Sequence, residues 1–143
     1  MSADNEKLVG RLQPPPDRDL ATLYRDESTV VTLTEAMAEF LDPSLESRYL
    51  GDGSGDVPAN VGLEGLRQTW LAWLGSWDSY RAEVIKVVDV GDRVLVVTDE
   101  RGREKDATDE VKLQGAAVWT VRGGQVTAID LYSDRTAAFK AVA

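Results

Sequence analysis

The chain has 143 residues, of which 43% are hydrophobic and 29% charged, a composition typical of one folded domain with its own core. A count of 16 Lys and Arg against 25 Asp and Glu gives a net charge of −9, which disfavours nucleic acid and anionic membrane surfaces as partners. The chain contains neither Cys nor His, which excludes disulfides, zinc–sulfur sites, thiolate nucleophiles and Ser–His catalysis.

The N-terminal residues lack the basic start and apolar run of a signal peptide, and no stretch approaches the roughly 18 apolar residues of a membrane helix. We therefore expect a cytoplasmic protein without a membrane partner. Residues 1–16 are polar and end in three prolines, which cannot continue a helix. This pattern predicts a flexible N-terminal arm over 1–16, followed by a single domain over 17–143.

The next segment predicts two short helices. Asp17 is a candidate N-cap for the first helix, which carries Leu20, Leu23 and Tyr24 at helical spacing. The β-branched run 28–32 interrupts that pattern, and a second helix follows over about 33–41. Asp42 and Pro43 end it, because a residue before proline avoids the α region.

A short strand is predicted over about 45–50, followed by a glycine-rich acidic loop over 51–56. This loop lacks the later bidentate glutamate of a calcium site, because position 63 is Leu, and we expect no metal site. The clearest helix covers about 62–77, where Trp70, Trp73 and Trp77 share one face with apolar neighbours. These indoles suit either a plain core or the wall of a pocket.

The rest of the chain is rich in strand-forming residues. Strands are predicted over 80–90, 93–100, 108–122 and 125–133, and a last helix over 134–142. Gly91-Asp92 and Gly123-Gly124 suit tight hairpin turns. A run of helices followed by a run of antiparallel strands indicates an α+β fold with helices packed on one sheet face.

Four motifs in this order resemble the NTF2-like superfamily, in its SnoaL-like branch of polyketide cyclases and steroid Δ-isomerase-like proteins. They are Gly62–Leu66 before the Trp-rich helix, Gly91–Val94 in the first hairpin, Val118–Val126 around the Gly-Gly turn, and Leu131–Arg135. The resemblance implies a cystatin-like cone, in which a curved antiparallel sheet wraps three to four helices around an internal cavity. It also implies a homodimer, and the family includes both enzymes and proteins that only bind.

The resemblance and strand alternation together predict which side chains enter that cavity. The expected pocket residues are Tyr24, Trp70, Trp73, Thr98, Leu113, Ala117, Trp119, Ile129 and Leu131. The candidate catalytic residues are Glu46, Arg48, Glu100 and Tyr24. A slip of one residue in strand register would instead bring Asp99, Asp130 and Tyr132 inside.

The family's known chemistries fit these residues poorly. By resemblance, Arg48 stands where a steroid isomerase has its base, and a guanidinium does not deprotonate near neutral pH. Ala117 stands where that site has its second acid. For an epoxide hydrolase, Glu100 matches one carboxylate, whereas Leu131 and Thr98 replace the other acid and the bridging Arg. Glu46, Arg48 and Glu100 form either a substitute trio or a structural ion pair.

We therefore expect a domain that binds a small hydrophobic molecule, with no cofactor. One alternative is an isomerase, cyclase or hydrolase that uses Glu46, Arg48 and Glu100. Another is a non-catalytic interaction module that pairs through the outer sheet face, whose residues are Val97, Val118, Thr120 and Tyr132.

Overall fold

The structure is a computed structural model that describes residues 2–143, with side chains from residue 4 onward. The helices are α1 (Ser2–Arg11), α2 (Leu20–Arg25), α3 (Glu27–Met37), α4 (Gly62–Leu74) and α5 (Arg135–Val142), with a short 3-10 turn at Ala38–Phe40. The strands are β1 (Leu41–Gly51), β2 (Asn60–Val61), β3 (Trp77–Val90), β4 (Arg93–Glu104), β5 (Val111–Arg122) and β6 (Gln125–Tyr132). One sheet contains all six strands in the order β2-β1-β6-β5-β4-β3.

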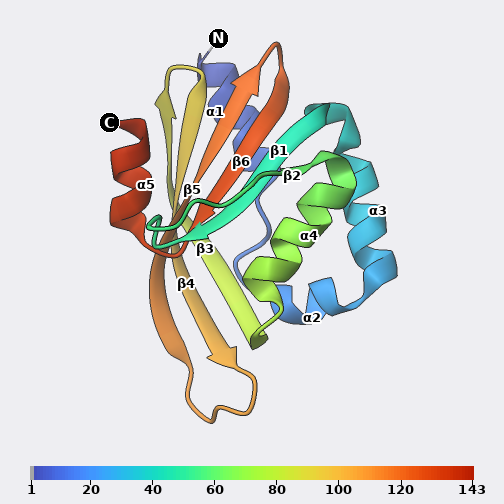
Figure 1. The fold of residues 1–143 in the computed structure, drawn as a ribbon, viewed down its shortest axis with the longest axis vertical. Helices are drawn as coiled ribbons and strands as arrows, with labels where there is room; N and C mark the ends of the chain where they lie inside the picture. The colour runs from blue at the N-terminus through green and yellow to red at the C-terminus, as the bar shows by residue number, and fades with distance from the viewer. Residues whose placement is uncertain (1) are drawn as a thin grey trace.

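The sheet is curved and open, with helices on both of its faces (Figure 1). Helices α1 to α4 contribute to the core on the concave face, whereas α5 packs on β4 and β5 from the convex face. The predicted α+β fold is therefore confirmed. The sheet is mixed rather than wholly antiparallel, because β1 pairs in parallel with β6.

The N-terminal segment differs from the irregular arm that we expected. Residues Ser2–Arg11 form helix α1, and Val9 is fully buried in the concave core. Leu8 and Leu12 pack against the same core, so these three residues form an apolar helical face within an otherwise polar segment. The domain boundary that we placed at residue 17 stays a prediction.

Two aspartates explain why α2 and α3 begin where they do. The N-cap of α2 is Asp19 rather than Asp17, and its side chain accepts hydrogen bonds from the backbone N–H groups of Ala21 and Thr22. Asp26 caps α3 by accepting from the N–H of Ser28. This cap starts a helix through the β-branched run 28–32, which we had expected to interrupt it.

The convex face is less accessible than the interaction-module hypothesis requires. Val97 and Val118 are buried in a cluster with Ala138 of α5, so they do not form an exposed pairing surface. The homodimer and the cytoplasmic location stay predictions. Within residues 2–143, no helix is both long enough and apolar enough to cross a membrane.

Asp19 also joins α2 to the edge of the sheet, since its carboxylate accepts a hydrogen bond of 3.0 Å from the N–H of Tyr80 in β3. We expect Asp19→Ala to lower the free energy of unfolding by about 1–2 kcal/mol, because the cap and this bond are both lost. Asp17→Ala is the matched control, with an expected change within about 0.5 kcal/mol. Urea denaturation of both variants checks this, and equal losses would contradict the assignment of the cap.

Candidate functional site

The central strands set which side chains face the concave side of the sheet. On β4, Thr98 and Glu100 follow Val94 and Val96 on this face, and Asp99 points the other way. On the neighbouring strand β5, Gly115 pairs with Thr98 and Leu113 pairs with Glu100, which defines the register of the two strands. The register in the structure is therefore the one that brings Glu100, and not Asp99, toward the interior.

Aromatic rings from helices and strands pack together over this face. Tyr24 of α2 stacks on Trp70 of α4 with ring centroids 4.8 Å apart and an interplanar angle of 15°. Trp73 meets Tyr80 of β3 edge-on at 5.3 Å, and Trp77 meets the same ring at 5.0 Å. Stacked and edge-on pairs are favoured geometries that hold such rings in defined positions. Trp77 belongs to β3, because α4 ends at Leu74, earlier than we predicted.

A cavity of about 70 Å³ lies among these rings. Of the expected pocket residues, the structure places Tyr24, Trp70, Trp73, Thr98, Ala117, Trp119 and Leu131 along its wall. Two others lie elsewhere: Ile129 is packed in the core, and Leu113 lines an open, mixed-charge groove of about 530 Å³. Trp119 is one of these wall residues, and its buried Nε1 has no hydrogen-bond partner among the described residues.

Glu100 supplies the carboxylate of this cavity and is only 7% exposed. Tyr80 donates its hydroxyl hydrogen bond to Oε1 of Glu100, and Thr98 donates to Oε2. Burial raises the pKa of Glu100 above its ordinary value, although both hydroxyl donors and the more distant Arg135 act in the opposite direction. Burial and the nearby Glu100 also raise the pKa of Tyr80. This carboxyl group is therefore held in place and retains its proton to a higher pH than an exposed one.

Two glycines make room for this polar cluster. A Cβ atom on Gly115 would lie 2.0 Å from Oε2 of Glu100 and 3.2 Å from the hydroxyl oxygen of Thr98. A Cβ atom on Gly102 would lie within 2.7 Å of the rings of Trp77 and Tyr80. Because both distances are shorter than van der Waals contact, any larger residue at these positions would displace the acid or its aromatic partner.

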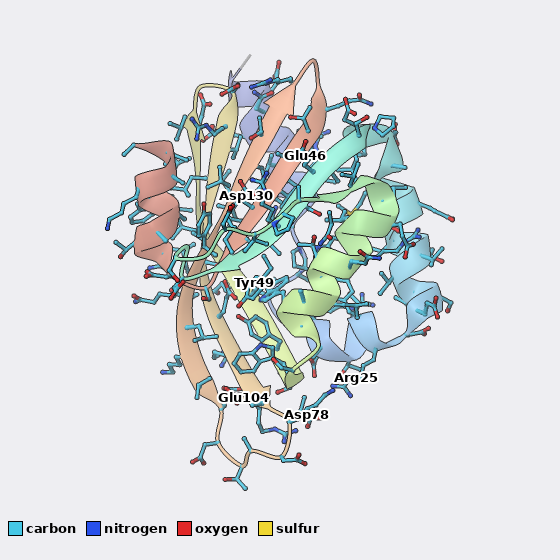
Figure 2. The ribbon with its side chains drawn as sticks, viewed as in Figure 1. Arg25, Glu46, Tyr49, Asp78, Glu104 and Asp130 are labelled. Carbon is cyan, nitrogen blue, oxygen red and sulfur yellow. The ribbon has the colours of Figure 1, made fainter. Side chains whose placement is uncertain are left out.

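Glu46 and Arg48 do not join this cluster, so the trio with Glu100, one of the two alternatives for these residues, does not form. On β1, Leu45 and Ser47 are buried on the concave side, while Glu46 and Arg48 lie on the opposite face. Arg48 forms ion pairs there with Glu46 at 3.5 Å and with Asp130 of β6 at 3.8 Å. Glu46 of β1 and Asp130 of β6 are labelled in Figure 2, and the two strands are neighbours in the sheet.

Asp130 therefore belongs to a separate cluster on the convex side. Burial raises its pKa, against the effect of Arg48. Arg48 thus forms an ion pair with Glu46, which is the other alternative that the sequence left open, and Asp130 is a second acid in the same cluster.

Sequence reasoning missed two tyrosines, Tyr80 beside Glu100 and Tyr49 on the wall of the cavity. Tyr80 alternates with Ala82 and Val84 along β3, with Arg81 and Glu83 facing outward, so the strand period could have placed it. Tyr49 lines the cavity from β1 by the same alternation (Figure 2). The segment Leu12–Pro14 also borders the cavity, although it was expected to be part of the arm.

The arrangement combines a small apolar space with one buried acid. It offers apolar and aromatic contact and a carboxyl group that can accept or donate a proton. In the part of the chain that the structure describes, no three Asp or Glu residues lie together in a way that could hold a metal ion.

Comparisons with solved structures support the fold at low sequence identity. A protein from Jannaschia sp. CCS1, described as a SnoaL-like polyketide cyclase, is 19% identical with a TM-score of 0.67, covering 99% of this chain and 92% of that chain. An NTF2-like protein of unknown function from Burkholderia pseudomallei K96243 is 14% identical with a TM-score of 0.64, covering 97% of each chain.

A protein of ketosteroid isomerase-like fold from Catenulispora acidiphila DSM 44928, solved in complex with trimethylamine, is 15% identical with a TM-score of 0.55. The match covers 75% of this chain and 79% of that chain. A search of curated proteins returns no match. At the level of sequence families, residues 27–129 match the SnoaL-like domain, which is more than half of the chain. The chain therefore belongs to the SnoaL-like domain family and has the NTF2-like fold that its motifs predicted.

Proposed function

We propose that this protein binds a small, largely apolar molecule in the cavity between the concave sheet face and α4. The observation that carries the proposal is the wall of this cavity, in which Tyr24, Trp70, Trp73 and Trp119 surround a space beside Ala117 and Leu131. Cavities with apolar and aromatic walls and a few polar groups are the common form of ligand site in proteins.

The size of the cavity limits the ligand. A volume of about 70 Å³ corresponds to about five water molecules, so the space as it stands suits a ligand of a few heavy atoms. Leu12, Gln13 and Pro14 border both this cavity and an outer groove of about 500 Å³ along α2 and α3. A ligand therefore enters past residues 12–14, and a larger one requires these residues to move.

The proposal predicts that filling the cavity prevents binding. Ala117→Leu adds apolar volume at the wall, and we expect it to weaken the binding of 1-propanol or 2-propanol at least about tenfold. The wild type should bind both probes, measured by tryptophan fluorescence and by the rise in melting temperature that ligand binding produces. Ala128→Leu is the control, because Ala128 does not line this cavity and lies next to Ile129 on the other face of β6. Absence of any binding by the wild type would rule out the proposal.

Glu100 favours a second candidate function, acid–base catalysis on the bound molecule. A buried carboxyl group with a raised pKa at a cavity wall is a common feature of such sites. Glu46 and Arg48 have no part in this candidate, because they lie on the other face of β1. The residue next to Glu100 is instead Tyr80, whose hydroxyl group donates a hydrogen bond to the Glu100 carboxylate.

The raised pKa predicts how stability depends on pH. The folded chain binds the Glu100 proton more tightly than the unfolded chain, so the free energy of unfolding should fall as pH rises above about 4.5 and through the folded pKa. In the Glu100→Gln variant, the decrease in the free energy of unfolding that comes from the Glu100 proton should be absent. Urea denaturation of both proteins between about pH 4 and pH 8 measures the difference. A difference that is independent of pH would show that Glu100 is not perturbed by burial.

A further inference from the structure

Glu100 is the only buried Asp, Glu, Lys or Arg among the residues whose side chains the structure describes. Its two oxygens accept from neutral hydroxyl groups, and no basic group of the described residues lies within ion-pair distance of it. Arg135, the nearest basic influence, is bonded instead to Asp99 and to the carbonyl of Thr98. The two hydroxyl groups solvate the carboxylate, but they leave its charge without a counter-charge.

The open groove on the other side of Glu100 does not supply that counter-charge. Its basic residues Arg81, Arg101 and Lys112 share the groove with Asp17, Glu83 and Asp99. Arg101 and Lys112 are exposed, and none of the three basic residues forms an ion pair with Glu100. An exposed charge in water is screened and compensates a buried carboxylate only weakly.

The cavity side of Glu100 is instead bordered by aromatic rings. The cavity that Glu100 lines is also lined by four aromatic residues, Tyr24, Trp70, Trp73 and Trp119. A fifth ring, that of Tyr80, is joined to the carboxylate by the hydrogen bond that its hydroxyl group donates to Oε1. Aromatic rings around a carboxylate form the environment in which proteins hold alkylammonium groups, because the ring faces attract a cation and tolerate its methyl groups. The net charge of −9 also attracts cations toward the molecule.

We propose that the ligand of this cavity is a small organic cation, an alkylammonium compound whose positive charge is neutralised by the carboxylate of Glu100 within the aromatic wall. The unpartnered Nε1 of Trp119 suits a ligand that also carries a hydrogen-bond acceptor, such as a hydroxyl oxygen. The volume of about 70 Å³ limits the cation to a few heavy atoms. This inference rests on the proposed function and goes further by naming the charge of the ligand.

Two probes of the same shape test the inference. Ethanolammonium and 1-propanol both have four heavy atoms and one hydroxyl group, and they differ in a terminal ammonium or methyl group, so both suit the small cavity. We expect the wild-type protein to bind ethanolammonium at least about tenfold more tightly than the neutral probe, measured by isothermal titration calorimetry. Equal binding, or tighter binding of the neutral probe, would overturn the inference and leave the proposed function intact. If neither probe binds, the proposed function fails as well.

The variants assign the preference to one carboxylate. Glu100→Gln should reduce the preference for ethanolammonium over 1-propanol to about twofold or less while the neutral probe still binds. Asp99→Asn is the matched control, because it removes the same charge from the neighbouring position on the opposite face of β4 and should keep the preference. A preference that survives Glu100→Gln would overturn the role of this residue. The comparison of the two probes on the wild type needs no variant, so it holds even if Glu100→Gln fails to fold.

Discussion

The structure depends on one constraint, which is that both faces of the curved sheet must be covered. On β4, Val94 and Val96 are buried on the concave side, and Leu95 and Val97 are buried on the convex side. Strands that are apolar on both faces require packing partners on both sides. The short helix α5 meets this need on the convex face, which is why Ala138 is fully buried in a helix of eight residues. The other helices cover the concave face, where the curvature of the sheet leaves room for the cavity.

The parts of the fold that the sequence predicted are those with local signals. Gly91, Gly123 and Gly124 all adopt positive φ values at the hairpin turns, where glycine is favoured, and the strands between them follow the alternation of side chains. The N-terminal half was harder because its signals compete. The β-branched run 28–32 disfavours a helix only weakly, whereas the Asp26 cap and the packing of Val30 stabilise one.

The site shows the same division between local pattern and long-range geometry. The resemblance predicted Arg48 at the position of an isomerase base inside the cavity, whereas in the structure it lies on the convex face of β1. The alternation of side chains along β1 was the better guide, because burying Arg48 beside apolar rings would cost several kcal/mol. The contact between Gly115 and Glu100 could not be predicted, because it depends on the exact register of β4 and β5.

Under the proposed function, the features that hold Glu100 also bear on which ligand the cavity accepts. Two hydroxyl groups donate hydrogen bonds to the carboxylate, and Gly115 leaves free the space beside Oε2 that a larger residue would fill. Opening the cavity requires Leu12–Pro14 to move, and this segment continues directly from α1, whose Val9 is fully buried. A larger ligand would therefore disturb the packing of α1, and its binding would be weakened by the lost burial of apolar surface. Under the two proposals, selection of the ligand by size would be coupled to the stability of the N-terminal helix, whereas selection by charge would be set by Glu100.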